Sequence, residues 1–177
     1  MKKYLILFIL SFFSFKESFA KHILGGEMYY DYIGPGSTPG TLEYLITLKL
    51  YRDPAGAALD AGITFSIFKT DTHATVATIS GIGLNGPFSI FYQTTNPCIA
   101  PPQTLIYDIG FYKTTVELPI SAGGYTIAYQ RCCRRTGILN LFASDTQGAT
   151  YFTTIPGTNA YQVLHKIPVQ NSLTGIR

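Results

Sequence analysis

Two adjacent cysteines, Cys132 and Cys133, stand in an arginine-rich segment and offer the most distinctive chemistry in this 177-residue chain. The segment reads GYTIAYQRCCRR over residues 124–135, and its arginines are Arg131, Arg134 and Arg135. Four kinds of chemistry suit such a segment: a metal site, a redox centre, a basic patch for an anion or nucleic acid, and a structural disulfide.

The metal and redox alternatives lack the spacing that they need. A zinc site uses about four ligands, often in closely spaced pairs. The three cysteines and two later histidines, His73 and His165, are not spaced in that way. A redox motif of the Cys-x-x-Cys type is also absent. We therefore expect neither a metal nor another cofactor.

The three cysteines Cys98, Cys132 and Cys133 are all disulfide candidates. Neighbours in a strand point to opposite faces, so Cys133 should face the core with Ile127 and Tyr129, and Cys132 should face outward. A bridge from Cys98 to either neighbour would close a loop of about 35 residues and contribute roughly 3–4 kcal/mol. A bond between the neighbours themselves is a strained alternative. Every pairing leaves one thiol over.

The arginines allow two interpretations. Arg131, Arg134 and Arg135 could contact an anion or a partner, holding a carboxylate, a phosphate or an acidic glycan. Alternatively, they cover a strand end and pair with Asp or Glu.

The remaining candidate residues predict no catalytic site. Lys21, His22 and Glu27 would offer a new amino terminus, an imidazole and a carboxylate, which is a weak copper site or simply the entry to a strand. His73 lies in a polar turn, and His165 alternates with apolar residues. Because a hydrolase needs a placed nucleophile and base, we expect the chain not to be an enzyme.

The elements that position these residues read as β-strands. Apolar residues alternate with polar ones along Thr41–Tyr51, which is typical of a half-buried strand. A strand near residues 26–33 precedes it, and short alternations follow at residues 63–67, 88–92, 112–118, 125–129, 151–155 and 161–167. Turn signals such as DPAG, NG and SAGG separate them, and only residues 137–144 are a candidate helix. Seven to nine short strands predict an all-β, antiparallel, immunoglobulin-like β-sandwich.

The amino-terminal segment is typical of a secretory signal peptide. Lys2 and Lys3 precede the apolar run YLILFILSFFSF, and SFA supplies small residues before a cleavage site. We expect residues 1–20 to be removed, residues 21–168 to form one domain and residues 169–177 to be a tail. Loss of three basic residues and one acidic residue lowers the formal net charge from +3 to +1. A nearly neutral chain does not favour a nucleic-acid partner.

Three segments carry a resemblance to a known family: HILGGEMYYDYIG, ITLKLYRD and GGYTIAYQRCCRRTGILNL. They resemble the amino-terminal module of large secreted surface proteins of gliding bacteria. Those proteins often carry immunoglobulin-like or polycystic-kidney-disease-type repeats and a gliding-motility-associated sorting domain. The resemblance implies a cell-surface, adhesin-like architecture without a known activity.

Two departures from that family concern the cysteines and the end of the chain. Family members commonly have a cysteine where this chain has Pro54, and another near Leu105 or Ile106. If the family bridges join those positions to the double cysteine and to Cys98, the resemblance implies that this chain has lost one half of each. The chain also lacks the sorting domain, so we expect a truncated or stand-alone version.

The sequence therefore predicts a secreted module with a structural or adhesive role in the periplasm, at the outer-membrane surface or outside the cell. We expect a protein or glycan partner at the cell surface and no membrane span after signal cleavage. The alternative is a carbohydrate-binding module for envelope or environmental glycans, because exposed tyrosines on a sandwich face can stack on sugars. The chain has no Trp, and most of its tyrosines are at strand positions that should face the core. Both observations favour the structural or adhesive role.

Overall fold

Seven antiparallel strands make up nearly all the regular structure in the computed structural model, which describes residues 22–93, 98 and 104–157. The described residues also include one short 3-10 helix, η1 (Ser144–Thr146). No helix in these ranges has the length and apolar character needed to cross a membrane. The strands are β1 (Ile23–Pro35), β2 (Thr41–Arg52), β3 (Gly62–Lys69), β4 (Thr75–Gln93), β5 (Thr104–Pro119), β6 (Tyr125–Cys132) and β7 (Gly148–Ile155).

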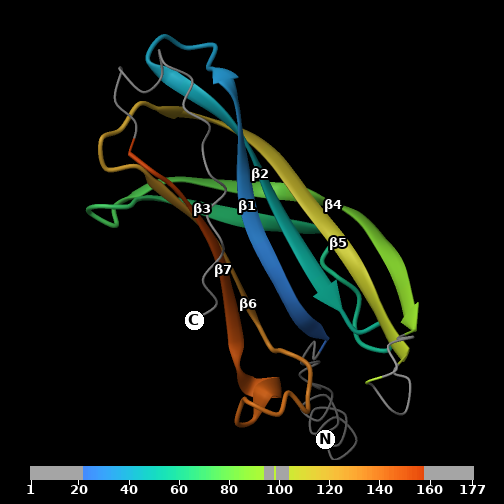
Figure 1. Ribbon diagram of the computed structural model, residues 1–177. Helices are drawn as coiled ribbons and strands as arrows, with labels where there is room; N and C mark the ends of the chain where they lie inside the picture. Colours follow the sequence, from blue (N-terminus) through green and yellow to red (C-terminus); the bar gives the residue numbers. More distant parts are fainter. Residues whose placement is uncertain (1–21, 94–97, 99–103, 158–177) are drawn as a thin grey trace, which may run out of the picture.

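The strand order is β1-β2-β5-β4-β3-β6-β7 (Figure 1). In an immunoglobulin constant domain, strands lettered in chain order form the sheets A-B-E-D and C-F-G. The same lettering here gives β1-β2-β5-β4 for the first sheet and β3-β6-β7 for the second. The antiparallel, immunoglobulin-like sandwich predicted from the sequence is therefore confirmed.

Strand β4 belongs to both sheets. Its residues 75–83 pair with β3, and its residues 84–93 pair with β5. The register shifts between Asn85 and Phe88, where Gly86 has a φ of 117° and the Gly86–Pro87 peptide bond is cis. The Asn-Gly pair, which is a hairpin-turn signal in the sequence, is thus a bulge inside one long strand. Its position, close to where β4 changes partners, fits the tendency of bulges to bend a strand.

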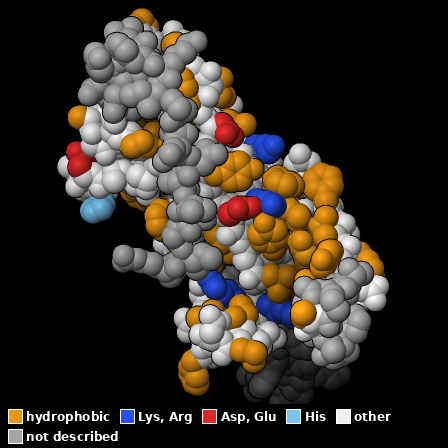
Figure 2. Space-filling model, viewed as in Figure 1, with side chains coloured by type: hydrophobic (Ala, Val, Ile, Leu, Met, Phe, Trp, Pro, Cys, Tyr) orange, Lys and Arg blue, Asp and Glu red, His pale blue; other side chains and the backbone are white. Residues whose placement is uncertain are grey.

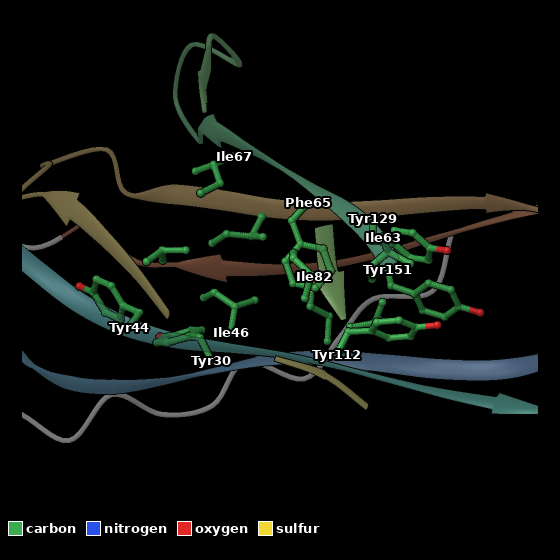
Figure 3. Packing of buried hydrophobic residues seen from close by; sticks show 14 of the residues in the cluster. Tyr30, Tyr44, Ile46, Ile63, Phe65, Ile67, Ile82, Tyr112, Tyr129 and Tyr151 are labelled. Atoms are coloured by element: carbon green, nitrogen blue, oxygen red, sulfur yellow. The ribbon is translucent and has the colours of Figure 1, made fainter. Parts of the chain in front are cut away.

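The core lies between the two sheets and follows the predicted alternation. Leu42, Tyr44, Ile46, Leu48 and Leu50 of β2 are all buried. Figure 3 shows Tyr30, Tyr44 and Ile46 on one side of the core and Phe65, Ile67 and Tyr129 on the other. Burying each large apolar side chain stabilises the fold by about 1.5–3 kcal/mol. The aromatic-rich strands therefore supply the main stabilisation of the sandwich.

The candidate helix at residues 137–144 is wrong. The chain forms turns there, and only Ser144–Thr146 is helical. Gly137 has a φ of 79° and Ala143 a φ of 45°. Left-handed residues at both ends interrupt the right-handed geometry that an α-helix needs. The strand expected at residues 161–167, the signal peptide expected at residues 1–20 and the tail expected at residues 169–177 lie outside the described residues.

Tyr125 closes the connection between β5 and β6. Its hydroxyl donates to the carbonyl oxygen of Pro119 at 2.8 Å, six residues upstream. A tyrosine at the start of the sixth strand that bonds back across this corner is a hallmark of immunoglobulin-like sandwiches. Lys69 Nζ lies 3.4 Å from the same hydroxyl oxygen and 4.7 Å from the ring centroid.

We expect Tyr125→Phe to lower the free energy of unfolding by about 1 kcal/mol, because the ring still packs while the hydrogen bond to Pro119 is lost. Urea denaturation followed by circular dichroism measures the change. Tyr92→Phe is the matched control, since Tyr92 is 55% exposed. Equal stability of Tyr125→Phe and the parent chain would show that the corner bond contributes nothing.

Glu117 of β5 holds the loop between β1 and β2. Its carboxylate accepts hydrogen bonds from the Thr41 hydroxyl, from the Thr38 amide at 2.6 Å and from the Ser37 hydroxyl at 2.9 Å. These bonds, with the Thr41 bond the largest cause, lower the pKa of Glu117 to about 2. The carboxylate therefore stays ionised in the folded state at pH values where an ordinary glutamic acid is protonated.

A lowered pKa adds stability that is present above the ordinary pKa of 4.5 and is lost as the pH falls toward about 2. We expect the melting temperature of the parent chain to fall more across this window than that of Glu117→Gln, which has no carboxylate to protonate. Thermal melts at the two ends of the window measure the difference. Parallel acid-induced losses in the two proteins would contradict the assignment.

Candidate functional site

Two connections that are distant in the sequence come to one end of the sandwich (Figure 1). Residues 53–61 join β2 to β3, and residues 133–147 join β6 to β7. Main-chain bonds tie both connections to the start of β1: the Asp53 amide donates to the His22 carbonyl at 2.9 Å, and the Arg135 amide donates to the Ile23 carbonyl at 3.0 Å. This loop-bearing end carries the two adjacent cysteines and the arginines that the sequence singles out.

The arginines pair mainly with aspartates of the β2–β3 connection. Arg131 forms an ion pair with Asp60, and Arg135 Nε lies 2.8 Å from Asp53 Oδ2. The main chain of Arg134 donates to the Gln147 carbonyl at 3.1 Å. The pairing alternative thus describes Arg131 and Arg135, and their positive charge is largely neutralised. The cluster is better suited to fixing loops than to capturing an anion.

A third ion pair, between Arg52 and Asp108, is almost completely buried. Arg52 Nε lies 2.9 Å from Asp108 Oδ2, and the two side chains are 12% and 6% exposed. Ser89 donates to the other carboxylate oxygen at 2.7 Å. The Arg52 guanidinium also donates to the carbonyls of Pro54 and Ala57, each at 3.0 Å. This network therefore joins β2, β5 and β4 and fixes the course of the β2–β3 connection.

The structure joins Cys132 to Cys133, with Cα atoms 3.5 Å apart. The expected long bridge from Cys98 to this pair is not formed, because Cys132 and Cys133 bond to each other. As the strand parity predicts, Cys133 is buried and Cys132 is exposed. Cys133 has a φ of 98°, so the chain turns sharply as it leaves β6. Cys98 is exposed.

The structure describes two of the three histidines, His22 and His73. His22 is fully buried, whereas His73 is exposed in the turn after β3; His165 lies outside the described residues. Glu27 bonds to Lys49 and Tyr51, each at 3.0 Å. Within residues 22–93, 98 and 104–157, no three His, Cys, Asp or Glu side chains are grouped to hold a metal ion.

A second surface, which we call the outer-face strip, covers the outside of the first sheet. Asp108, Gly110 and Tyr112 of β5 are buried, so the alternate residues of this strand point away from the core. The pairing register brings side chains from β2 and β4 onto the same face. Figure 2 shows the resulting gathering of hydrophobic side chains over β4 and β5. The strip consists of Tyr51, Phe88, Ile90, Tyr92, Leu105, Tyr107, Ile109 and Phe111.

The aromatic rings of the strip meet at steep angles. Tyr51 and Tyr107 have centroids 5.8 Å apart with planes at 70°, and Phe88 and Phe111 are 6.2 Å apart at 58°. Lys49 lies at the margin, 5.1 Å from the Tyr51 centroid and 3.0 Å from Glu27. Phe88, Tyr92 and Leu105 are each about half exposed. The strip is therefore an irregular apolar surface with a charged rim.

Neither the strip nor the Arg52–Asp108 pair was predicted from the sequence. The available signal for the strip was the run LIYDIGFY at residues 105–112, in which every residue of the outward parity (Leu105, Tyr107, Ile109 and Phe111) is apolar or aromatic. A strand with one solvated face shows polar residues at alternate positions. Apolar residues at the outward-facing positions of such a strand thus indicate a face that is covered or that binds a partner.

We expect Asp108→Asn to lower the free energy of unfolding by about 3–5 kcal/mol, because it leaves the buried Arg52 charge without its partner. Asp53→Asn is the matched control: it breaks the pair with the half-exposed Arg135 and should change stability by less than about 1 kcal/mol. Guanidinium denaturation of both variants measures the contrast. Similar losses in the two would show that burial does not distinguish the pairs.

No family model matches the chain, and comparisons with curated proteins and with solved structures found no match. The assignment of the fold accordingly depends on the strand order and on the Tyr125 corner. Any functional assignment has to come from the two surfaces of this chain: the loop-bearing end and the outer-face strip.

Proposed function

We propose that this chain is a secreted module of the cell envelope or cell surface, with a structural or adhesive role and no catalytic activity. The outer-face strip is the observation that carries the proposal. Soluble domains rarely expose large contiguous apolar patches, and rimmed patches of this kind mark protein or membrane contacts. The strip would supply the contact area, and the Lys49–Glu27 pair at its margin would supply a polar rim.

The chemistry of the loop-bearing end supports the same role. Arginines that could attract an anionic ligand are paired with Asp53 and Asp60. A disulfide such as Cys132–Cys133 persists in oxidising compartments. The signal-like segment at residues 1–20 would direct the chain to such a compartment. Together these features suit a rigid secreted module better than a catalyst.

The ring geometry bears on the carbohydrate-binding alternative. A pyranose stacks on a ring that presents its flat face to solvent, and a longer glycan needs several such faces in one plane. Tyr51 and Tyr107 are set at 70° to each other, so they do not form a shared platform. A contact with an irregular protein surface therefore suits the strip better than an extended glycan.

A binding assay on intact producing cells and a glycan array together test the proposal. We expect the purified chain to bind cells, and Phe88→Ser to weaken that binding at least about tenfold, because hot-spot aromatics contribute 2 kcal/mol or more. Phe88 is 49% exposed, so the substitution should leave the fold intact. Val76→Ser is the matched control, since Val76 is 39% exposed on the other half of β4.

The array separates the two candidate functions. Glycan binding that Tyr107→Ser abolishes would replace the adhesive role with the carbohydrate-binding one. Cell binding that is equal in Phe88→Ser, Val76→Ser and the parent chain would show that the strip is not the contact surface.

A further inference from the structure

The second half of β4 is an edge of the first sheet. Residues 84–93 pair with β5 on one side, while β3 pairs only with residues 75–83 (Figure 1). Among the described strands, none lies on the other side of residues 88–93. An edge strand of this kind presents a row of main-chain donors and acceptors that an added strand can use.

This edge lacks the usual protection against strand addition. Natural edges are guarded by charged side chains, by proline or by bulges. Strand β4 contains no Asp, Glu, Lys or Arg in its 19 residues. Pro87 and the bulge lie before residue 88, so they limit the edge at one end and leave FSIFYQ, residues 88–93, without a guard.

The paired strand offers no substitute guard. Asp108 is the one charged residue between residues 104 and 112 of β5, and it is buried against Arg52 and Ser89. Side chains on both faces of this ribbon are exposed: Phe91 is 68% and Tyr92 is 55% exposed, although neighbours in a strand point oppositely. The ribbon therefore extends beyond the core, with apolar groups on each side.

We propose that residues 88–93 pair with the same residues of a second copy of this chain, antiparallel and about a twofold axis. An extended strand is the one occupant that uses the main-chain groups of the edge. In an antiparallel pairing about a twofold axis, residue i lies opposite residue j and j opposite i, so a charged residue near the axis would lie close to its own copy. Because FSIFYQ carries no charge, self-pairing has no such penalty.

Pairing in this way joins two sheets into one. The order would become β1-β2-β5-β4 followed by the partner's four strands in reverse, which hydrogen-bonds the exposed edge of both copies. The two outer-face strips would then form one continuous surface. The inference does not depend on the proposed function, since it concerns only the association of the purified chain.

Analytical ultracentrifugation of the intact chain over a roughly hundred-fold concentration range tests the pairing. We expect a monomer–dimer equilibrium. Phe91→Lys should raise the dimer dissociation constant at least about tenfold, because it places two like charges in one small interface. Val76→Lys, on the half of β4 that pairs with β3, should leave the constant unchanged. Circular dichroism verifies that both variants fold.

Amide hydrogen exchange of the parent chain provides a readout that needs no substitution. In an antiparallel ladder, every second residue of the segment 88–93 directs its main-chain amide toward β5. The amides of the other residues in this segment point to the open edge. We expect only the second set to gain protection as the concentration rises.

Several results would overturn the proposal. One is a dimer that Val76→Lys dissociates and Phe91→Lys does not. Another is a chain that is monomeric at every concentration and whose edge amides are unprotected. The edge would then be open to a strand of another protein and not to a second copy. A third is a monomer whose edge amides are protected at all concentrations, which would mean that the same chain covers its own edge.

Discussion

One strand has to serve two sheets, and much of this molecule follows from that constraint. The first half of β4 must pair with β3, and the second half must pair with β5. A strand that changes partners has to bend, and the bulge at Asn85–Phe88 lies close to this change. Beyond it, the strand is carried past the core together with β5. The same geometry that closes the sandwich thus exposes both the outer-face strip and the uncharged edge.

Charge is used differently at the loop-bearing end. The Arg52–Asp108 pair has little contact with water, and ion pairs in such places stabilise a fold less than their strength suggests. Its value lies in direction: a guanidinium held by one carboxylate aims its remaining donors at the carbonyls of Pro54 and Ala57. The connection is then set for Asp53 and Asp60 to meet Arg135 and Arg131. The Arg52–Asp108 pair thus helps to set the positions at which the Asp53–Arg135 and Asp60–Arg131 pairs form.

The sequence was informative where a residue's role is decided by its own strand. Alternation identified β2 and the outward face of Cys132, the last residue of β6, because a period of two needs no knowledge of other strands. It failed where the outcome depends on two elements. The Asn85-Gly86 pair favours a turn locally. Pairing with β5 resumes at Phe88, however, and this keeps the chain within one long strand. The partner of Cys132 and the Arg52–Asp108 pair likewise depend on folded geometry, which spacing alone does not contain.

A disulfide between neighbours leaves the domain without a covalent cross-link between its sheets. The bond from Cys132 to Cys133 closes a small ring within one turn and ties no strand to another. A long bridge would shield the residues that it encloses from tension. Here the described strands could all be drawn out if a surface-attached chain were pulled from its two ends. Resistance to such a pull would come from hydrogen-bonded ladders and buried side chains alone, and after release the sandwich could reassemble without any bond having to be re-formed by oxidation.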